Sequence, residues 1–238
     1  MKEKLTKKER VQLKGLVSKY GQKSLLEAIN YKKIFPYILT GGLMLGGMKT
    51  INNHYIPTEK AQSQYVSSQI NKYNENLFQE KLDAVVEMMD KVLHKTGRSI
   101  DDISFNPENV VRLCREYDFD LPLMLAQMQC ESHFGTDSKA RSTGSVLSIG
   151  LYDDGRVLAR YDNQDDCFEP YIRIMQRDYL QNGAVSVDDL LENGKFVNKL
   201  GKRYAKNEKY ERDIRITRNK IMKDYPVLAQ KYLTDENV

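Results

Sequence analysis

The chain has few of the residues that build disulfide frameworks or metal sites. Its 238 residues include three cysteines and three histidines. Cys114, Cys130 and Cys167 form no CxxC pair and have no interleaved histidine. The sequence therefore predicts neither a zinc site nor a disulfide framework, and we expect no metal or other cofactor. Each cysteine stands in an apolar or helical context, which favours a buried thiol.

Long low-complexity tracts and apolar runs of the usual membrane-spanning length are also missing. Hydrophobic residues make up 40% of the chain, which excludes a disordered protein and allows one ordinary core plus an appendage. The longest uncharged stretch is residues 34–48, with four glycines and flanking lysines. Extended to residue 51, it predicts a membrane anchor at 34–51, with a glycine-rich hairpin in a soluble protein as the alternative.

The body of the chain has no net positive charge. The net charge is +4, yet residues 1–33 carry ten lysines or arginines against three glutamates, a balance of +7 that leaves −3 for the rest. We therefore expect residues 1–33 to form a basic helical head, for which an anionic membrane surface and plain solvent are the alternative surroundings. The head lacks interleaved aromatic residues and the body is slightly acidic, so we expect no nucleic-acid partner.

A helical repeat precedes the main domain. Between Pro57 and Leu93, apolar residues recur four and three positions apart, with a one-residue shift at Phe78. The spacing predicts a helical stalk or linker over 52–97, whose second half, residues 78–93, packs on the domain that follows. We expect that domain to span residues 98–238.

One apolar helix in this domain ends in a single carboxylate. Asp118 or Asp120 can cap the helix, Pro122 fits its first turn, and apolar residues lie nearly all round it up to Cys130. Glu131 follows at the C-terminal end, where the helix dipole and desolvation both disfavour the anion. A raised pKa is therefore predicted for Glu131, as a general acid near neutral pH requires. A solvated carboxylate is the alternative.

Other local signals complete the expected fold, which is mainly α. Asn106 and Pro107 mark a helix start. Asp153-Asp154-Gly155 is a turn between two apolar segments, the pattern of a small β-hairpin. Further helices are expected at residues 167–180, 187–192, 196–204 and 210–233, the last interrupted at Pro226.

Three motifs, in order across residues 106–225, resemble the glucosaminidase family of peptidoglycan hydrolases. They are Glu131-Ser132-His133-Phe134-Gly135 followed by Ser145-Val146-Leu147-Ser148-Ile149-Gly150, then Arg160-Tyr161-Asp162 with the acidic turn at Asp165-Asp166, and Tyr204-Ala205-Lys206-Asn207-Glu208-Lys209-Tyr210. The resemblance implies a lysozyme-like α+β domain with one small hairpin. It also implies cleavage of the β-1,4 bond after N-acetylglucosamine in cell-wall glycan.

The resemblance assigns roles to residues of these motifs. Glu131 becomes the general acid and Tyr204 a catalytic tyrosine that orients the sugar. Asp153 and Asp154 are the nearest candidates for a second carboxylate, although the pair is also simply a good turn. On an N-acetylated sugar, the substrate's own amide can replace that carboxylate. The implied substrate-binding residues are Ser132, Phe134, Ser145, Tyr161 and Tyr210.

Two other functions stay open at the level of sequence. A lytic transglycosylase would place a Glu-Ser pair similarly, but its later Gly-Leu-Met-Gln is here Gly150-Leu151-Tyr152-Asp153. A non-catalytic wall-binding or virion assembly protein is the other alternative. The expected location is a membrane-anchored position facing the cell wall, or a phage-encoded, virion-associated one.

Overall fold

The computed structural model describes residues 48–51, 54–57, 59–151, 156–183, 185–192, 196–205, 207 and 209–234. These residues are mainly helical, as the sequence predicts. The chain divides into two compact units, Met1–Leu77 with Lys231–Val238, and Phe78–Gln230.

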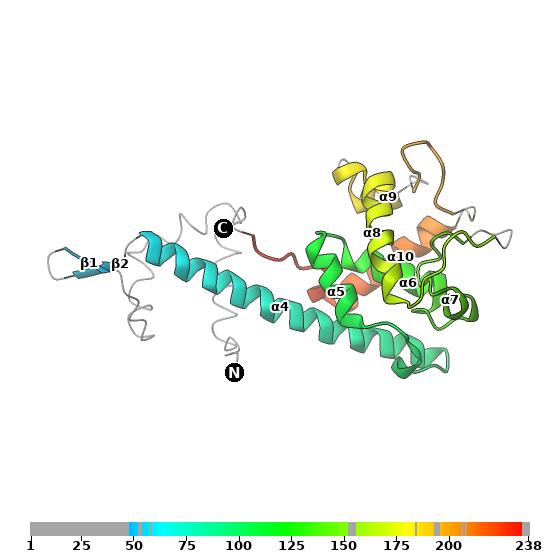
Figure 1. Cartoon of the computed structure of the whole chain (residues 1–238), viewed down its shortest axis with the longest axis horizontal. Helices are drawn as coiled ribbons and strands as arrows, with labels where there is room; N and C mark the ends of the chain where they lie inside the picture. Colours follow the sequence, from blue (N-terminus) through cyan, green and yellow to red (C-terminus); the bar gives the residue numbers. More distant parts are fainter. Residues whose placement is uncertain are drawn as a thin grey trace. The chain divides into compact units, whose positions relative to one another are not determined.

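The first unit contains a two-stranded antiparallel sheet and the start of a long helix. Strand β1 (Met48–Ile51) pairs with β2 (His54–Pro57), and α4 (Glu59–Lys95) begins two residues later (Figure 1). The side-chain amide of Asn74 exchanges two hydrogen bonds of 2.8 Å with the backbone of Leu233. This pairing ties the end of the chain to the first half of α4, because both amide groups are buried and satisfied.

Most of the predicted anchor at 34–51 lies outside the described residues, as does the basic head at 1–33. The last four residues of the predicted segment form β1, because their backbone pairs with β2. Among the residues that the structure describes, no helix is long and apolar enough to cross a membrane.

The second half of α4 belongs to the second unit, which begins at Phe78 and not at residue 98. Val85, Met89 and Leu93 are fully buried in its core. Their spacing of four places them on one face of the helix, which therefore packs like an ordinary amphipathic helix. The predicted packing of residues 78–93 on the domain is confirmed.

Helix α6 (Leu121–Ser132) occupies the centre of the second unit. Asp120 is its N-cap, accepting a hydrogen bond of 2.7 Å from the backbone N–H of Leu123, and Pro122 lies in the first turn, as predicted. Its first two turns are buried all round. Figure 1 shows the helices that lie about it, α5 (Pro107–Glu116), α8 (Phe168–Ile174) and α10 (Tyr210–Asp224).

The other helical segments of this unit are short: η2 (Ile100–Asp102), α7 (Ser138–Thr143), η3 (Asp165–Cys167), the π-helical η4 (Met175–Tyr179), η5 (Gln181–Gly183), α9 (Val187–Leu191) and η6 (Pro226–Ala229). The predicted helix at 196–204 is wrong, because Val197 and Arg203 instead form an antiparallel bridge. At the predicted hairpin, Leu151 bridges Val157. Residues 152–155 lie outside the described chain, so the rest of that hairpin stays a prediction.

The cysteines divide between core and surface. Cys114 and Cys167 are buried, as predicted, but Cys130 is exposed. The prediction is wrong for Cys130 because the last turn of α6 leaves the core, and its sulfur lies 3.6 Å from Thr217 Oγ1 at the edge between α6 and α10.

Lys81 on α4 is a buried cation with an unusual protonation equilibrium. It is 5% exposed and donates a hydrogen bond of 3.3 Å to the carbonyl of Leu228. Burial lowers its pKa to about 8. The unfolded chain therefore binds more protons than the folded chain between about pH 8 and the ordinary lysine pKa near 10.5, and the free energy of unfolding rises with pH across that window.

We expect Lys81→Met to lose this rise. Between pH 7.5 and 9.5 the free energy of unfolding of the wild type should gain roughly 2 kcal/mol relative to the variant. Denaturant unfolding of both full chains at several pH values measures the difference. Lys95→Met, at an exposed position of the same helix, is the control and should keep the wild-type rise. Parallel pH curves for the wild type and Lys81→Met would contradict the expectation.

Candidate active site

The chain reverses direction directly after Glu131. The backbone N–H of His133 donates to the carbonyl of Gln129, and that of Phe134 to the carbonyl of Met128. These bonds and the left-handed conformation of His133, with φ of 47°, form a Schellman-type C-cap. The cap turns Phe134 inward, where it is completely buried, so Glu131 stands at the point where the helix leaves the core.

Ser132 and Gly135 fix the loop that follows. The Ser132 hydroxyl donates to the Val146 carbonyl at 2.6 Å and accepts from the Gly135 N–H at 2.8 Å. Gly135 has φ of 74°, and a Cβ there would lie 2.5 Å from Oε1 of the buried Gln164. Only glycine fits both conditions without strain. The Ser132 side chain therefore ties the loop to the end of α6 at both Gly135 and Val146.

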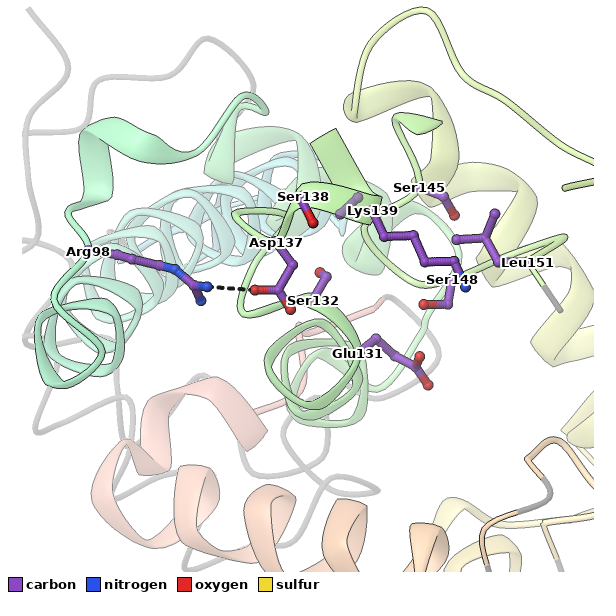
Figure 2. A pocket seen from close by; sticks show the side chains of 10 residues that line it. Arg98, Glu131, Ser132, Asp137, Ser138, Lys139, Ser145, Ser148 and Leu151 are labelled. Atoms are coloured by element: carbon purple, nitrogen blue, oxygen red, sulfur yellow. Dashed lines mark hydrogen bonds and ion pairs between the residues drawn. The ribbon is translucent and has the colours of Figure 1, made fainter. Parts of the chain in front are cut away.

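A pocket of about 480 Å³ opens beside this loop, within the usual size range of small-ligand sites. Its lining comes from the end of α6, from α7 and from the loop that leads to Leu151: Arg98, Glu131, Ser132, Asp137, Ser138, Lys139, Ala140, Ser145, Ser148 and Leu151. Figure 2 shows Lys139 extending toward Ser148 and Leu151, with the Arg98–Asp137 pair on the other side of the pocket. Most of the lining is hydroxyl or charged groups.

The two carboxylates in this lining differ in their partners. Asp137 accepts a hydrogen bond of 2.7 Å from Arg98 and lies 3.3 Å from the ring of His133. Glu131 is half-buried and accepts a hydrogen bond of 2.6 Å from the hydroxyl of Tyr210, at the start of α10. Asp137 is therefore paired with a cation, and Glu131 accepts a hydrogen bond from a neutral donor.

Tyr210 remains protonated over the whole ordinary pH range. Burial, the neighbouring Tyr204 and the charge of Glu131 raise the pKa of Tyr210 well above its usual value. Its hydroxyl is therefore a permanent hydrogen-bond donor to the carboxyl group. A neutral donor can hold both the ionised and the protonated carboxyl, as a group that gains and loses a proton in each turnover requires.

Three aromatic rings cluster with the ring of Tyr210, which carries this hydroxyl. The rings of Tyr204 and Tyr210 stack with centroids 5.5 Å apart and an interplanar angle of 18°. Phe196 contacts both rings, and Tyr179 contacts Phe196 and Tyr204. Burial of Phe196 is complete, so the stack anchors Tyr210 to the core and limits the rotation of its side chain.

An ion pair holds the turn that carries Tyr204 against α10. The guanidinium of Arg203 donates to both carboxylate oxygens of Glu211, at 2.7 and 2.8 Å. Glu211 is 5% exposed. Because Arg203 and Glu211 directly neighbour the two tyrosines in sequence, the pair fixes the positions of both rings.

The structure changes the role expected for Tyr204. Its hydroxyl donates to the Leu147 carbonyl at 3.4 Å, while Tyr210, predicted as a substrate-binding residue, is the one that bonds to Glu131. Burial and the charge of Glu131 raise the pKa of Tyr204 well above its usual value. Tyr204 therefore lies beside the acid as a half-buried, neutral ring.

The other predicted site residues differ in where they lie. Ser132 and Ser145 line the pocket, although the hydroxyl of Ser145 already lies 3.3 Å from the Ile149 carbonyl. The prediction that Phe134 stacks on a sugar is wrong, because the C-cap buries the ring. Tyr161 packs against the core and is not part of the pocket lining. Asp153 and Asp154 lie outside the described residues.

Gln127 is the site residue that the sequence analysis missed. It is fully buried, and its amide donates a hydrogen bond of 2.9 Å to the hydroxyl of Tyr210. The signal was present: Gln127 precedes Glu131 by four residues in a helix, so the two share a face. A polar side chain within an apolar helix must also find hydrogen-bond partners.

No protein-family model matches this chain, and neither a curated protein nor a solved structure matches it.

Proposed function

We propose that the second unit is a lysozyme-like, glycan-cleaving domain. In this proposal it hydrolyses the β-1,4 bond after N-acetylglucosamine in peptidoglycan, with Glu131 as the general acid. The observation that carries the proposal is the position of Glu131: it ends a buried helix, lines a polar pocket and accepts a hydrogen bond from a permanently neutral tyrosine. A structural carboxylate at a helix end has no need of the last two features.

The chemistry of glycan cleavage matches the groups in the pocket. A protonated carboxyl must give its proton to the leaving glycosidic oxygen as the bond from that oxygen to C1 breaks. The other described carboxylate of the pocket, Asp137, is already paired with Arg98. We therefore assign the attack on C1 to the oxygen of the substrate's own N-acetyl group. Water then opens the resulting ring at C1 and returns a proton to Glu131.

The serine-rich lining suits this substrate class. Ser138 and Ser148 belong to the pocket together with Lys139, and hydroxyl and ammonium groups are the donors that sugar hydroxyls, acetamido carbonyls and carboxylates accept from. These groups favour a polar sugar over an apolar ligand.

Digestion of purified peptidoglycan by the full chain tests the proposal. After reduction with borohydride, mass analysis should find N-acetylglucosaminitol, the reduced form of N-acetylglucosamine, at the newly formed ends. Anhydro-muramyl ends would instead identify a transglycosylase. Binding without turnover across a broad pH range would identify a wall-binding protein, and either outcome overturns the hydrolase.

Lys139 should set a preference for the anionic form of the glycan. Its side chain is exposed, lies in the pocket lining and forms no ion pair with another described residue. Peptidoglycan carries carboxylates, whereas N-acetylglucosamine oligomers are neutral. We expect Lys139→Gln to raise KM for peptidoglycan by about threefold to tenfold, the scale of one exposed charge contact, and to leave KM for the neutral oligomers unchanged.

The control for this prediction is Lys202→Gln, at an exposed position outside the pocket lining, which should change neither KM. An equal change in KM for the charged and the neutral glycans on Lys139→Gln would show that Lys139 does not bind the carboxylates of peptidoglycan.

A further inference from the structure

A chain of hydrogen bonds runs from the core to Glu131. The hydroxyl of Tyr171, on α8, donates to Oε1 of Gln127. Nε2 of Gln127 donates to the hydroxyl oxygen of Tyr210 at 2.9 Å, and that hydroxyl donates to Oε1 of Glu131 at 2.6 Å. Gln127 is fully buried and Tyr171 is 1% exposed. The chain therefore lies in the core and ends at the half-buried acid.

The direction of each bond in this chain follows from its donors. Burial raises the pKa of Tyr171 well above its usual value, so its hydroxyl keeps its hydrogen and donates it to the amide oxygen of Gln127. The amide nitrogen then faces Tyr210, and an amide nitrogen can only donate. The oxygen of Tyr210 must accept from Gln127, which leaves its one hydrogen for Glu131.

The amide group of Gln127 therefore bridges two tyrosines from different helices, Tyr171 on α8 and Tyr210 on α10. The hydroxyl of the neighbouring Tyr204 donates to the Leu147 carbonyl. A flipped amide would present its oxygen to Tyr210 and its nitrogen to the hydroxyl of Tyr171, which breaks this pattern.

We propose that Gln127 is a positioning residue that holds the Tyr210 hydroxyl in place as a hydrogen-bond donor to Glu131. By accepting from Tyr171 and donating to Tyr210, it directs the Tyr210 hydrogen to Oε1 of Glu131. The role of this hydrogen bond in catalysis rests on the proposed function, whereas the arrangement of the hydrogen bonds does not.

Other ionisable groups near Glu131 also affect its protonation, in addition to the chain of hydrogen bonds through Gln127 and Tyr210. The described groups that interact with its charge include Tyr171, Tyr204, Tyr210 and Cys130, and the charged side chains that share the pocket are Arg98, Asp137 and Lys139. The hydroxyl of Tyr210 donates a hydrogen bond of 2.6 Å to the Glu131 carboxyl. Removing the Tyr210 hydroxyl therefore removes a donor that favours the ionised form.

Titration of the Glu131 carboxyl by NMR, in the full chain with ¹³C-labelled glutamate, tests the inference without any need for turnover. Tyr210→Phe should move the titration midpoint to higher pH by about one unit, the scale of one hydrogen bond to a charged group. Gln127→Leu should move it in the same direction by less, because the Tyr210 hydrogen is then free to turn away. The double variant should match Tyr210→Phe alone.

Two matched controls separate positioning from general damage. Tyr117→Phe removes a hydroxyl that also donates to a glutamate, Glu169, but outside the pocket. Gln129→Leu changes an amide on the same helix as Gln127. Both should leave the Glu131 midpoint unchanged. Where Gln127→Leu fails to fold, Gln127→Met or Tyr171→Phe replaces it, with the same direction of shift expected.

The activity of the same variants gives a separate readout. If the full chain cleaves glycan, the alkaline limb of its pH–rate profile should move with the NMR midpoint. A chain that shows the NMR shifts without any turnover would overturn the proposed function but would still support the arrangement of the hydrogen bonds. An unchanged midpoint in Gln127→Leu and its replacements, or additive shifts in the double variant, would overturn the inference about Gln127.

Discussion

Glu131→Gln should lower the rate of glycan cleavage by at least about 10²-fold, the usual scale for a lost general acid. Glutamine keeps the shape of the side chain and can still accept the hydrogen bond from Tyr210, but it has no proton to give to the leaving oxygen. The free energy of unfolding should change little, because the side chain is only half-buried at the end of α6. Initial rates of release of reducing ends from peptidoglycan measure the effect.

Glu169→Gln is the matched control for this variant. Glu169 also accepts a hydrogen bond from a tyrosine hydroxyl, that of Tyr117, and it is additionally paired with Arg173. It lies outside the pocket lining, so its replacement should leave the rate of cleavage at the wild-type level. Wild-type activity in Glu131→Gln would show that the acid lies elsewhere.

The second large effect concerns the ion pair that joins α10 to the start of α6. Arg218 donates to both oxygens of Asp120, at 3.1 and 2.7 Å, and to Asp188 at 2.7 Å. The side chain of Arg218 is 8% exposed and that of Asp120 is 22% exposed. Asp120 is also the N-cap of α6, through its bond to the Leu123 N–H.

Arg218→Met should therefore lower the free energy of unfolding by about 3 kcal/mol, because it leaves the partly buried carboxylate of Asp120 without its cation. Denaturant unfolding of the full chain, followed by circular dichroism, measures the change. Arg212→Met removes an exposed arginine whose partner is the adjacent Asp213, and it should have little effect. Similar stabilities of the two variants would mean that the buried pair contributes nothing beyond a surface one.

Much of the helical framework follows from local signals in the sequence. Asp120 and Pro122 predict the start of α6, and Asn106 and Pro107 predict the start of α5 in the same way. The Asn106 side chain accepts a hydrogen bond of 3.0 Å from the Glu108 N–H. Such capping bonds involve residues two or three positions apart, so they can be predicted without knowledge of the tertiary fold.

The partners of Glu131 depend on contacts across the fold, so the sequence alone does not identify them. Tyr204 and Tyr210 are six residues apart and chemically identical. Which of them reaches the acid depends on the bridge at Val197 and Arg203, in a segment where a helix was predicted. The burial of Phe134 depends on two consecutive positive φ values, at His133 and Phe134, which are uncommon for residues other than glycine.

The most direct test of the account is hydrolysis of peptidoglycan by the full chain in water enriched in ¹⁸O, with the wild type and Glu131→Gln compared side by side. Acid-catalysed hydrolysis breaks the bond at C1 and places an oxygen atom from water there. Mass analysis should find one ¹⁸O at each new N-acetylglucosamine end in the wild type, and labelled ends reduced at least about 100-fold in the variant. Unlabelled products from the wild type, or equal labelling by the two proteins, would contradict the account.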